Sequence, residues 1–135
     1  MKPLPALIGQ VQCTIERSKS GFDRLWPKYT LSLSNGNRYM LTGKKKGMNT
    51  TSHYMITIDQ QKFQKDANGY LGKVRSNMLG TEFSIYDCKE NPKKTGAGKE
   101  ETRQQLGVVQ YETNVLGSKG PRRMKVLLPM VSRDG

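Results

Sequence analysis

A lysine and an arginine two positions apart, in Lys73-Val74-Arg75, form the most specific chemical feature of the sequence. On a β-strand both cations project from one face, about 6.5–7 Å apart along the chain, while Val74 points to the other face, into the core. Two cations at this spacing can straddle neighbouring phosphates of one ligand, because the point charge of lysine complements the planar fork of arginine. The same pair is also typical of a solvated strand face that keeps a protein soluble. Spacing alone leaves both interpretations open, and in both we expect the two cations to face solvent.

The overall charge favours an anionic partner. Lys and Arg number 23 against 11 Asp and Glu, which gives a formal net charge of +12 over 135 residues. Nucleic acid, an acidic protein surface and an anionic membrane leaflet would all attract such a chain, and composition alone puts nucleic acid first. The basic run Lys44-Lys45-Lys46 is typical of a solvated turn, and equally of a loop that faces a membrane or nucleic acid.

Residues suited to catalysis or metal binding are few. Cys13 and Cys88 lie far apart in the chain, and we interpret them as free thiols in a reducing compartment. The single histidine, His53, excludes a metal cluster built on histidines. Glu100-Glu101 falls in a predicted mobile loop, and no serine sits in a nucleophile elbow. The sequence therefore predicts a protein that is not an enzyme and has no metal or cofactor.

Period-two alternation of apolar residues predicts a single all-β domain. Only 34% of the residues are apolar, so we expect a thin core. Asn35-Gly36-Asn37 indicates the turn of a β-hairpin. Two segments are expected to be loops, residues 43–49 and the mobile, Gly/Lys-rich residues 88–101. The strands are expected around residues 11–15, 29–33, 38–41, 54–58, 70–75, 82–86, 107–111 and 124–128.

Three blocks of the sequence resemble the tubby domain of the tubby-like proteins. They are TSHYMITID at 51–59, GYLGKVRSNMLGTEFSIYD at 69–87 and YETNVLGSKGPRRM at 111–124. The resemblance implies a β-barrel threaded by an apolar helix and used to bind phosphoinositides. It covers about the first half of that domain, so we expect an incomplete barrel without the later strands and the central helix. Residues 1–10 would be a lead-in and 11–135 a partial tubby domain: a fragment, a truncated product or a chain whose second half has been left out.

The resemblance also assigns binding residues. The lysine and arginine that grip the inositol phosphates in the family fall on Lys73 and Arg75, and a further groove arginine falls on Arg103. His53 stands where the family has an asparagine contact, and an imidazole can donate a hydrogen bond to phosphate. The expected phosphoinositide site therefore comprises Lys73, Arg75, Arg103 and His53, with Lys44, Lys45 and Lys46 as auxiliary cations.

The partners that the resemblance implies are the phosphatidylinositol 4,5-bisphosphate headgroup and the anionic membrane surface that carries it. It implies a cytoplasmic protein held peripherally at the inner leaflet of the plasma membrane, with the cilium and the nucleus as further locations. Delivery of membrane receptors to cilia would depend on trafficking machinery that binds a segment before the domain, which we expect to lie outside this sequence. The alternative is a nucleic-acid-binding or transcription-regulating module that uses the same basic groove.

Overall fold

The computed structural model describes residues 9–65, 67–93, 102–113 and 122–130. They form one antiparallel sheet of eight strands whose spatial order follows the chain. Two short 3-10 turns lie in the connections, η2 (Gly21–Arg24) and η3 (Asn35–Asn37). The all-β prediction is confirmed. The strands are β1 (Cys13–Arg17), β2 (Lys28–Leu33), β3 (Arg38–Lys45), β4 (His53–Thr57), β5 (Tyr70–Ser76), β6 (Glu82–Asp87), β7 (Gln105–Tyr111) and β8 (Met124–Leu127).

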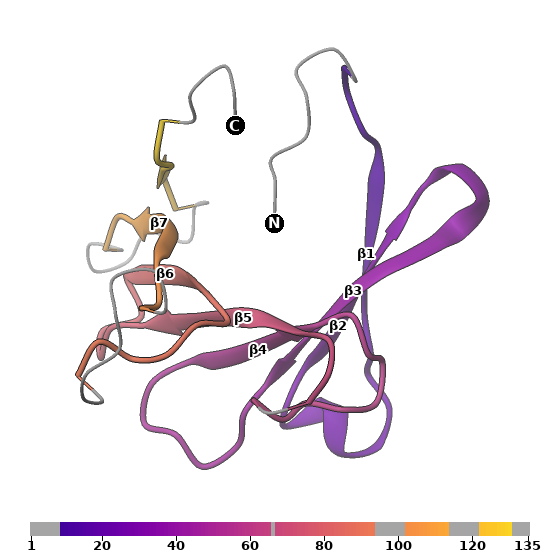
Figure 1. Cartoon of the computed structure of the whole chain (residues 1–135), viewed down its shortest axis with the longest axis horizontal. Helices are drawn as coiled ribbons and strands as arrows, with labels where there is room; N and C mark the ends of the chain where they lie inside the picture. Colours follow the sequence, from indigo (N-terminus) through magenta and orange to yellow (C-terminus); the bar gives the residue numbers. More distant parts are fainter. Residues whose placement is uncertain (1–8, 66, 94–101, 114–121, 131–135) are drawn as a thin grey trace.

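The sheet is curved like part of a barrel wall. Figure 1 shows β4 and β5 at its base, with β1 rising on one side and β6 and β7 on the other. Each strand pairs with its neighbours in sequence, and within the described residues β1 and β8 do not pair with each other. This open, curved sheet is the incomplete barrel that the sequence led us to expect. Among the described residues, no helix is long and apolar enough to cross a membrane.

The strand register divides the side chains between two faces of the sheet. Residues directly opposite each other on antiparallel strands point to the same side. His53 lies opposite Arg75, Met55 opposite Lys73, and Lys73 opposite Tyr86. We call the side that carries these residues the polar face. The expectation that Lys73 and Arg75 share one face is therefore confirmed.

The opposite side of the sheet, the apolar face, forms a hollow of about 300 Å³. Aromatic rings meet on this side, because Tyr29 and Tyr54 lie 6.2 Å apart, and Phe83 meets Tyr111 edge-on at 5.8 Å. No apolar side chain of the described residues is fully buried, so these strands hold their apolar residues together without a closed core. The hollow is lined by Ile15, Tyr29, Leu31, Leu41, Gly43, Tyr54, Ile56, Val74 and Phe83.

The predicted hairpin turn at residues 35–37 is confirmed. Gly36 and Asn37 have φ angles of 72° and 48°. This left-handed region suits glycine, and asparagine tolerates it better than most residues. The chain reverses there, and β2 and β3 pair from Leu33 opposite Arg38 to Lys28 opposite Lys44.

The prediction that residues 43–49 form a loop was wrong for its first three residues. Gly43, Lys44 and Lys45 belong to β3. The strand extends this far because both neighbours pair with it: Lys44 lies opposite Lys28 on β2 and opposite Met55 on β4. Of the second expected loop, residues 94–101 lie outside the described residues.

The alternation predicted for residues 54–58 fails at its last position. Ile58 lies beyond the end of β4 and its exposed fraction is 54%. Ile58 is exposed because β4 and its pairing with β3 end at Thr57. The register shift between Ile56 and Thr57 leaves the extra residue, Leu71, on β5 and does not change the alternation of β4. Thr57 is instead the buried residue, at 1% exposure.

Candidate functional site

The centre of the polar face brings together three of the four residues expected to bind an anion. His53 begins β4 and lies directly opposite Arg75 near the end of β5, and Lys73 precedes Arg75 on the same face. The intervening Val74 lines the apolar face, as predicted. The alternation of β5 thus separates two cations from the apolar side chain between them.

Arg103 reaches the same group of residues from a distant part of the chain. We call His53, Lys73, Arg75 and Arg103 together the cluster. Its amide donates a 2.7 Å hydrogen bond to the carbonyl of Glu90. The next amide, of Gln104, donates to Oδ1 of Asp87 at 3.1 Å. These bonds hold the segment before β7 against the end of β6, and the Arg103 guanidinium lies 4.5 Å from the ring centre of Tyr86. Because Tyr86 is opposite Lys73, Arg103 completes the predicted set of residues.

Mutual repulsion of cations is visible in the pKa values at this site. Burial lowers the pKa of Lys73, and the charges of Arg103 and Arg75 lower it further. Burial together with Arg75, Lys73 and Lys46 lowers the pKa of His53 from 6.5 to about 4, so its imidazole is neutral at pH 7. The expectation that Lys73 faces open solvent was wrong: Arg75 is exposed, but Lys73 is half-buried.

The cations of this cluster have unused hydrogen-bonding capacity. Among the described residues, Lys73, Arg75 and Arg103 form no ion pair, and the nearby carboxylate of Glu90 is bound by Lys65. The Nε atom of Arg103 is buried and has no hydrogen-bond partner in the described part of the chain. Such an arrangement can accept an anion, which would relieve the repulsion and satisfy the free donors.

The auxiliary cations divide among three environments. Lys44 lies 3.4 Å from the carboxylate of Asp23, and its Nζ lies 5.3 Å from the ring centre of Phe63. Lys45 points to the other side of the sheet, since it lies opposite Tyr54 of the apolar face. The charge of Lys46 contributes to the low pKa of His53. Lys46 is thus the auxiliary cation that lies close enough to the cluster for its charge to lower the pKa of His53.

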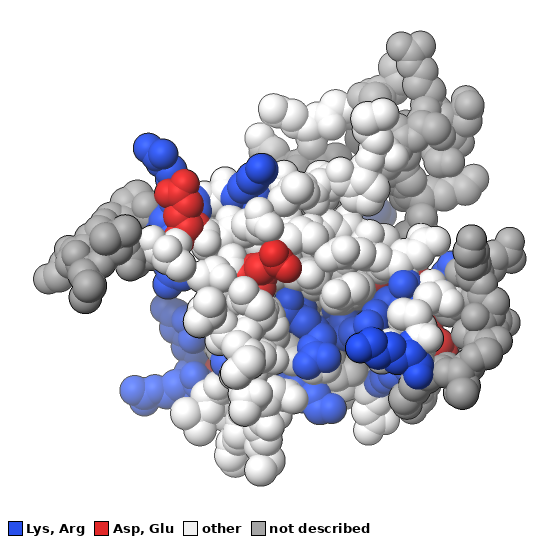
Figure 2. Space-filling model, turned by 90° about the vertical axis from the view of Figure 1, so that its left-hand side faces the viewer, with Lys and Arg blue, Asp and Glu red and all other residues white. Residues whose placement is uncertain are grey.

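An apolar hollow with a basic rim adjoins the cluster on the side of β3. It has a volume of about 630 Å³, and Met55, which forms part of it, lies opposite Lys73. In Figure 2, Lys and Arg side chains gather mainly in the lower half of the face, with uncharged side chains between them. The sequence analysis did not predict this hollow. Aromatic residues close to basic ones in the segments that line it could have indicated it. Its lining residues are Trp26, Lys44, Lys45, Lys46, Gly47, Met48, Met55, Phe63, Gln64 and Lys65.

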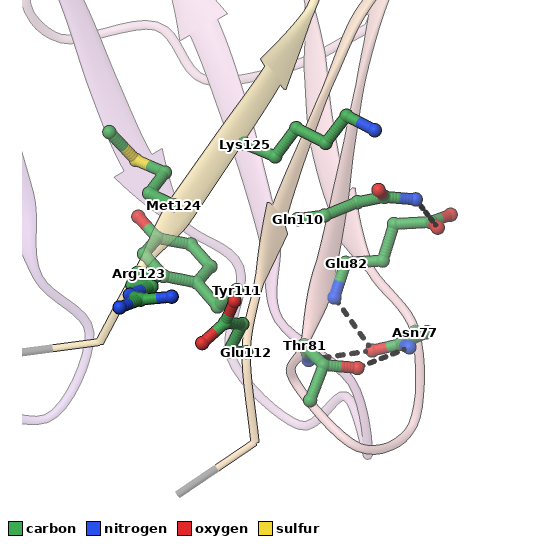
Figure 3. A pocket seen from close by; sticks show the side chains of 9 residues that line it. All are labelled: Asn77, Thr81, Glu82, Gln110, Tyr111, Glu112, Arg123, Met124 and Lys125. Carbon is green, nitrogen blue, oxygen red and sulfur yellow. Dashed lines mark hydrogen bonds between the residues drawn. The ribbon is translucent and has the colours of Figure 1, made fainter.

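A second hollow, of about 520 Å³, lies where β6, β7 and β8 meet. Figure 3 shows its mixed charges: Glu112 lies beside Arg123, and Gln110 lies between Glu82 and Lys125. The side chain of Asn77 accepts hydrogen bonds from the amides of Thr81 and Glu82, and Gln110 donates to Glu82 at 3.1 Å. These bonds fix the β5–β6 turn that follows Arg75. The two carboxylates of this hollow, of Glu82 and Glu112, make it less suited to phosphate than the polar face is.

The described residues contain no group of three or more His, Cys, Asp or Glu side chains that could hold a metal ion. Chemically, the polar face offers positive charge, hydrogen-bond donors and an aromatic ring that supports Arg103. Fold and site together define a β-sheet domain with a basic face whose chemistry suits an anion.

Comparison with known proteins identifies the family. The model of the Tub family matches residues 1–135, and the chain belongs to this family. Mouse Tubby-related protein 3 is 42% identical over 125 residues, which cover 88% of this chain and 27% of that protein. Tubby protein homolog 1 of Caenorhabditis elegans is also 42% identical, over 87% of this chain and 29% of its own length. The chain thus spans only about a quarter to three-tenths of the length of these relatives.

Proposed function

We propose that the polar face binds the phosphorylated headgroup of a phosphoinositide, and that phosphatidylinositol 4,5-bisphosphate is the ligand. The observation that carries this proposal is the convergence of Lys73, Arg75 and Arg103 without an ion pair in the described residues. The half-buried position of Lys73 strengthens its attraction for an anion, because the effective dielectric constant is lower there than in water.

Several phosphates on one ring suit this cluster better than a single carboxylate does. Arginine binds two phosphate oxygens with its fork, and lysine adds a compact charge between neighbouring groups. The free Nε of Arg103 supplies a further donor. His53, which is neutral at pH 7, can donate one hydrogen bond without adding to the repulsion.

Headgroup binding would tether the protein to the inner leaflet of the plasma membrane. By family resemblance, this tether would serve the trafficking of membrane receptors, including receptors of cilia. A nucleic-acid module would instead present aromatic rings among its cations for base stacking. Here Tyr29, Tyr54 and Phe83 line the apolar face, away from the cluster, and the ring of Tyr86 beside the cluster is covered by the Arg103 guanidinium.

The proposal is tested by co-sedimentation of the 135-residue chain with vesicles. Vesicles containing phosphatidylinositol 4,5-bisphosphate are compared with phosphatidylserine vesicles of the same total charge, and with vesicles of other phosphoinositides. We expect selective binding to the bisphosphate. Equal binding to all anionic vesicles of matched charge would overturn the proposal.

In the same experiment, duplex DNA is added as a competitor of the vesicles. A nucleic-acid-binding face would give a log–log salt slope of about −0.9 for each phosphate contacted. We expect duplex to compete poorly at physiological salt. Nanomolar duplex binding that excess soluble inositol trisphosphate leaves unchanged would favour the nucleic-acid function instead.

A further inference from the structure

Large exposed apolar side chains are concentrated in the connections at one edge of the sheet. In an antiparallel sheet whose order follows the chain, the β1–β2, β3–β4 and β5–β6 connections share one edge, and β2–β3, β4–β5 and β6–β7 start from the other. The middle of the long β4–β5 connection, around Phe63, folds back to line the hollow beside the first edge. The first edge carries five such side chains, whereas the described connections of the second edge carry only Ile58. We call the five the apolar edge: Phe22, Leu25, Met48, Met78 and Leu79, which are 69–103% exposed.

The three connections of this edge form one continuous surface. A Cβ atom on Gly47 would lie 2.5 Å from Nε1 of Trp26, so the β3–β4 connection packs tightly against the β1–β2 connection. The β3–β4 connection in turn meets the end of β5, where the β5–β6 turn begins, because the amide of Ser52 donates to Oγ of Ser76 at 2.9 Å. Figure 1 shows the β1–β2 and β3–β4 connections together at the bottom of the molecule, away from the β2–β3 hairpin.

The edge is held in place by specific contacts. Phe22 stacks on Trp26 with a ring separation of 6.2 Å. The Asp23–Lys44 ion pair fastens η2 to β3, and the amide of Lys45 donates to the carbonyl of Pro27 at 2.9 Å. Met48 has a φ of 58°, a strained angle for methionine, and its side chain is 103% exposed. A strained residue that presents a fully exposed apolar side chain is a feature typical of functional surfaces.

We propose that the apolar edge inserts into the interfacial layer of an anionic bilayer while the neighbouring cluster binds a headgroup of that bilayer. This inference rests on the proposed function. His53 and Arg75 lie at the ends of β4 and β5 that adjoin this edge. The cluster and the apolar edge can therefore contact the same bilayer surface at the same time.

Charge complementarity identifies the bilayer as the occupant of this edge. Lys19, Arg24 and Lys46 lie among the exposed apolar residues in the three connections. The one acidic residue there, Asp23, is paired with Lys44. Aromatic and methionine side chains next to cations that form no ion pair within the described part of the chain match the layer where lipid headgroups meet acyl chains. A partner protein of acidic character would need apolar contacts of a fixed shape, whereas lipids adapt to a convex edge.

The single tryptophan of the chain makes insertion directly measurable. Trp26 packs against the β3–β4 connection at this edge, and it is the only Trp in the sequence. Vesicles of phosphatidylcholine with phosphatidylinositol 4,5-bisphosphate are prepared with bromine on shallow or on deep acyl carbons. We expect Trp26 fluorescence to be quenched by the shallow label and much less by the deep one. Absence of quenching in protein that sediments with the vesicles would overturn the inference.

A matched pair of triple variants tests whether the residues of the apolar edge contribute to vesicle binding. Met48→Asn with Met78→Gln and Leu79→Gln removes apolar side chains from the edge, and Asn suits the left-handed φ at position 48. Met40→Gln with Ile58→Gln and Met130→Asn makes equivalent changes on exposed residues at the opposite edge. We expect only the first variant to lose vesicle affinity, by roughly tenfold or more, because less apolar surface leaves water on binding. Equal losses in both variants would contradict the inference.

Titration with soluble inositol trisphosphate separates the two proposals. The first triple variant should bind this headgroup as the unmodified chain does. If soluble headgroup and bisphosphate vesicles both bind but Trp26 is never quenched, the proposed function stands and insertion is wrong. If the edge is a contact between two copies of the chain, ultracentrifugation without lipid will show a dimer that the first triple variant abolishes, which also overturns insertion.

Discussion

The two faces of the sheet are maintained by different interactions. On the polar face the hydroxyl of Thr42, which is 0% exposed, lies 3.1 Å from that of Tyr39. On the apolar face, the aromatic and aliphatic side chains around the hollow are half-exposed, apart from Ile15, which is exposed. Strand β5 contributes to both, since Lys73 and Arg75 project to one side and Val74 to the other. Substitutions of the polar-face residues of β5 should therefore affect binding. Substitutions at other positions of the same strand should affect stability.

The largest effect is expected at Gly72, where the backbone of β6 leaves no room for a side chain on β5. A Cβ atom at this position would lie 2.1 Å from the carbonyl oxygen of Tyr86, and φ is 155°. Gly72→Ala must push the two strands apart, and we expect a loss of unfolding free energy of about 3 kcal/mol or more. The measurement is urea denaturation followed by far-UV circular dichroism and the fluorescence of Trp26.

Gly80→Ala is the matched control for this substitution. Gly80 also has a positive φ, of 66°, but a Cβ atom there would meet nothing within 4 Å. Its replacement should therefore cost only the conformational strain, about 1–2 kcal/mol. Similar losses for both variants would mean that the close approach of β5 and β6 does not limit stability.

The sequence predicted those features that depend on local pattern. Period-two alternation located the strands and placed Lys73 and Arg75 on one face, because the direction of a side chain on a strand follows from its parity. The hairpin at Asn35-Gly36-Asn37 was equally predictable, since its backbone angles suit these two residue types.

Features that depend on distant contacts could not be derived in this way. The family resemblance named Arg103, but its position beside Lys73 results from bonds to Asp87 and Glu90 that no periodicity reveals. The half-burial of Lys73 follows from that same arrangement. The partner of Lys44, Asp23, lies in a different connection, so an apparently free lysine of the basic run proved to be paired.

The next largest effect concerns binding, and it should leave stability almost unchanged. Lys73→Ala with Arg75→Ala removes two charge-assisted contacts, so we expect affinity for bisphosphate vesicles to fall by about 100-fold. The fold should be retained or slightly stabilised, because repulsion with Arg103 is relieved. Co-sedimentation measures the first quantity and urea denaturation the second.

Arg38→Ala with Lys125→Ala is the control for this double variant. It removes one lysine and one arginine from exposed positions away from the cluster, and thus changes the net charge equally. We expect only a small, salt-sensitive loss of vesicle binding. If the Lys73/Arg75 variant still prefers the bisphosphate to phosphatidylserine, the residues assigned to the site are wrong.

A smaller effect is expected from Arg103→Lys, which keeps the charge but loses the planar group. Lysine lacks the buried Nε donor and cannot stack on Tyr86 as a guanidinium does. We expect soluble inositol trisphosphate to bind roughly five- to tenfold more weakly, in calorimetry at constant ionic strength. Unchanged affinity would show that Arg103 contributes charge alone.

The smallest effect concerns the pH dependence that His53 confers. Its pKa is lowered from 6.5 to about 4 by burial and by the neighbouring cations. The unfolded chain therefore binds more protons between these values, and stability should fall as the pH drops from about 6.5 towards 4, by at most about 1.4 kcal/mol per pH unit. In His53→Asn this contribution should disappear from denaturation curves measured across that pH range.

The pH dependence of phosphate binding should have the opposite sign to that of stability. A phosphate beside His53 stabilises the protonated imidazole and so raises its pKa. The complex then takes up a proton, and lower pH favours binding by this residue. Phosphate itself loses charge below about pH 6, which weakens binding in every variant. The informative quantity is therefore the difference between the unmodified chain and His53→Asn, which should grow from pH 7 to pH 5 by less than about tenfold per pH unit. If affinity changes with pH equally in both proteins, His53 does not contact the phosphate. Lys73, Arg75 and Arg103 would then remain as the binding residues.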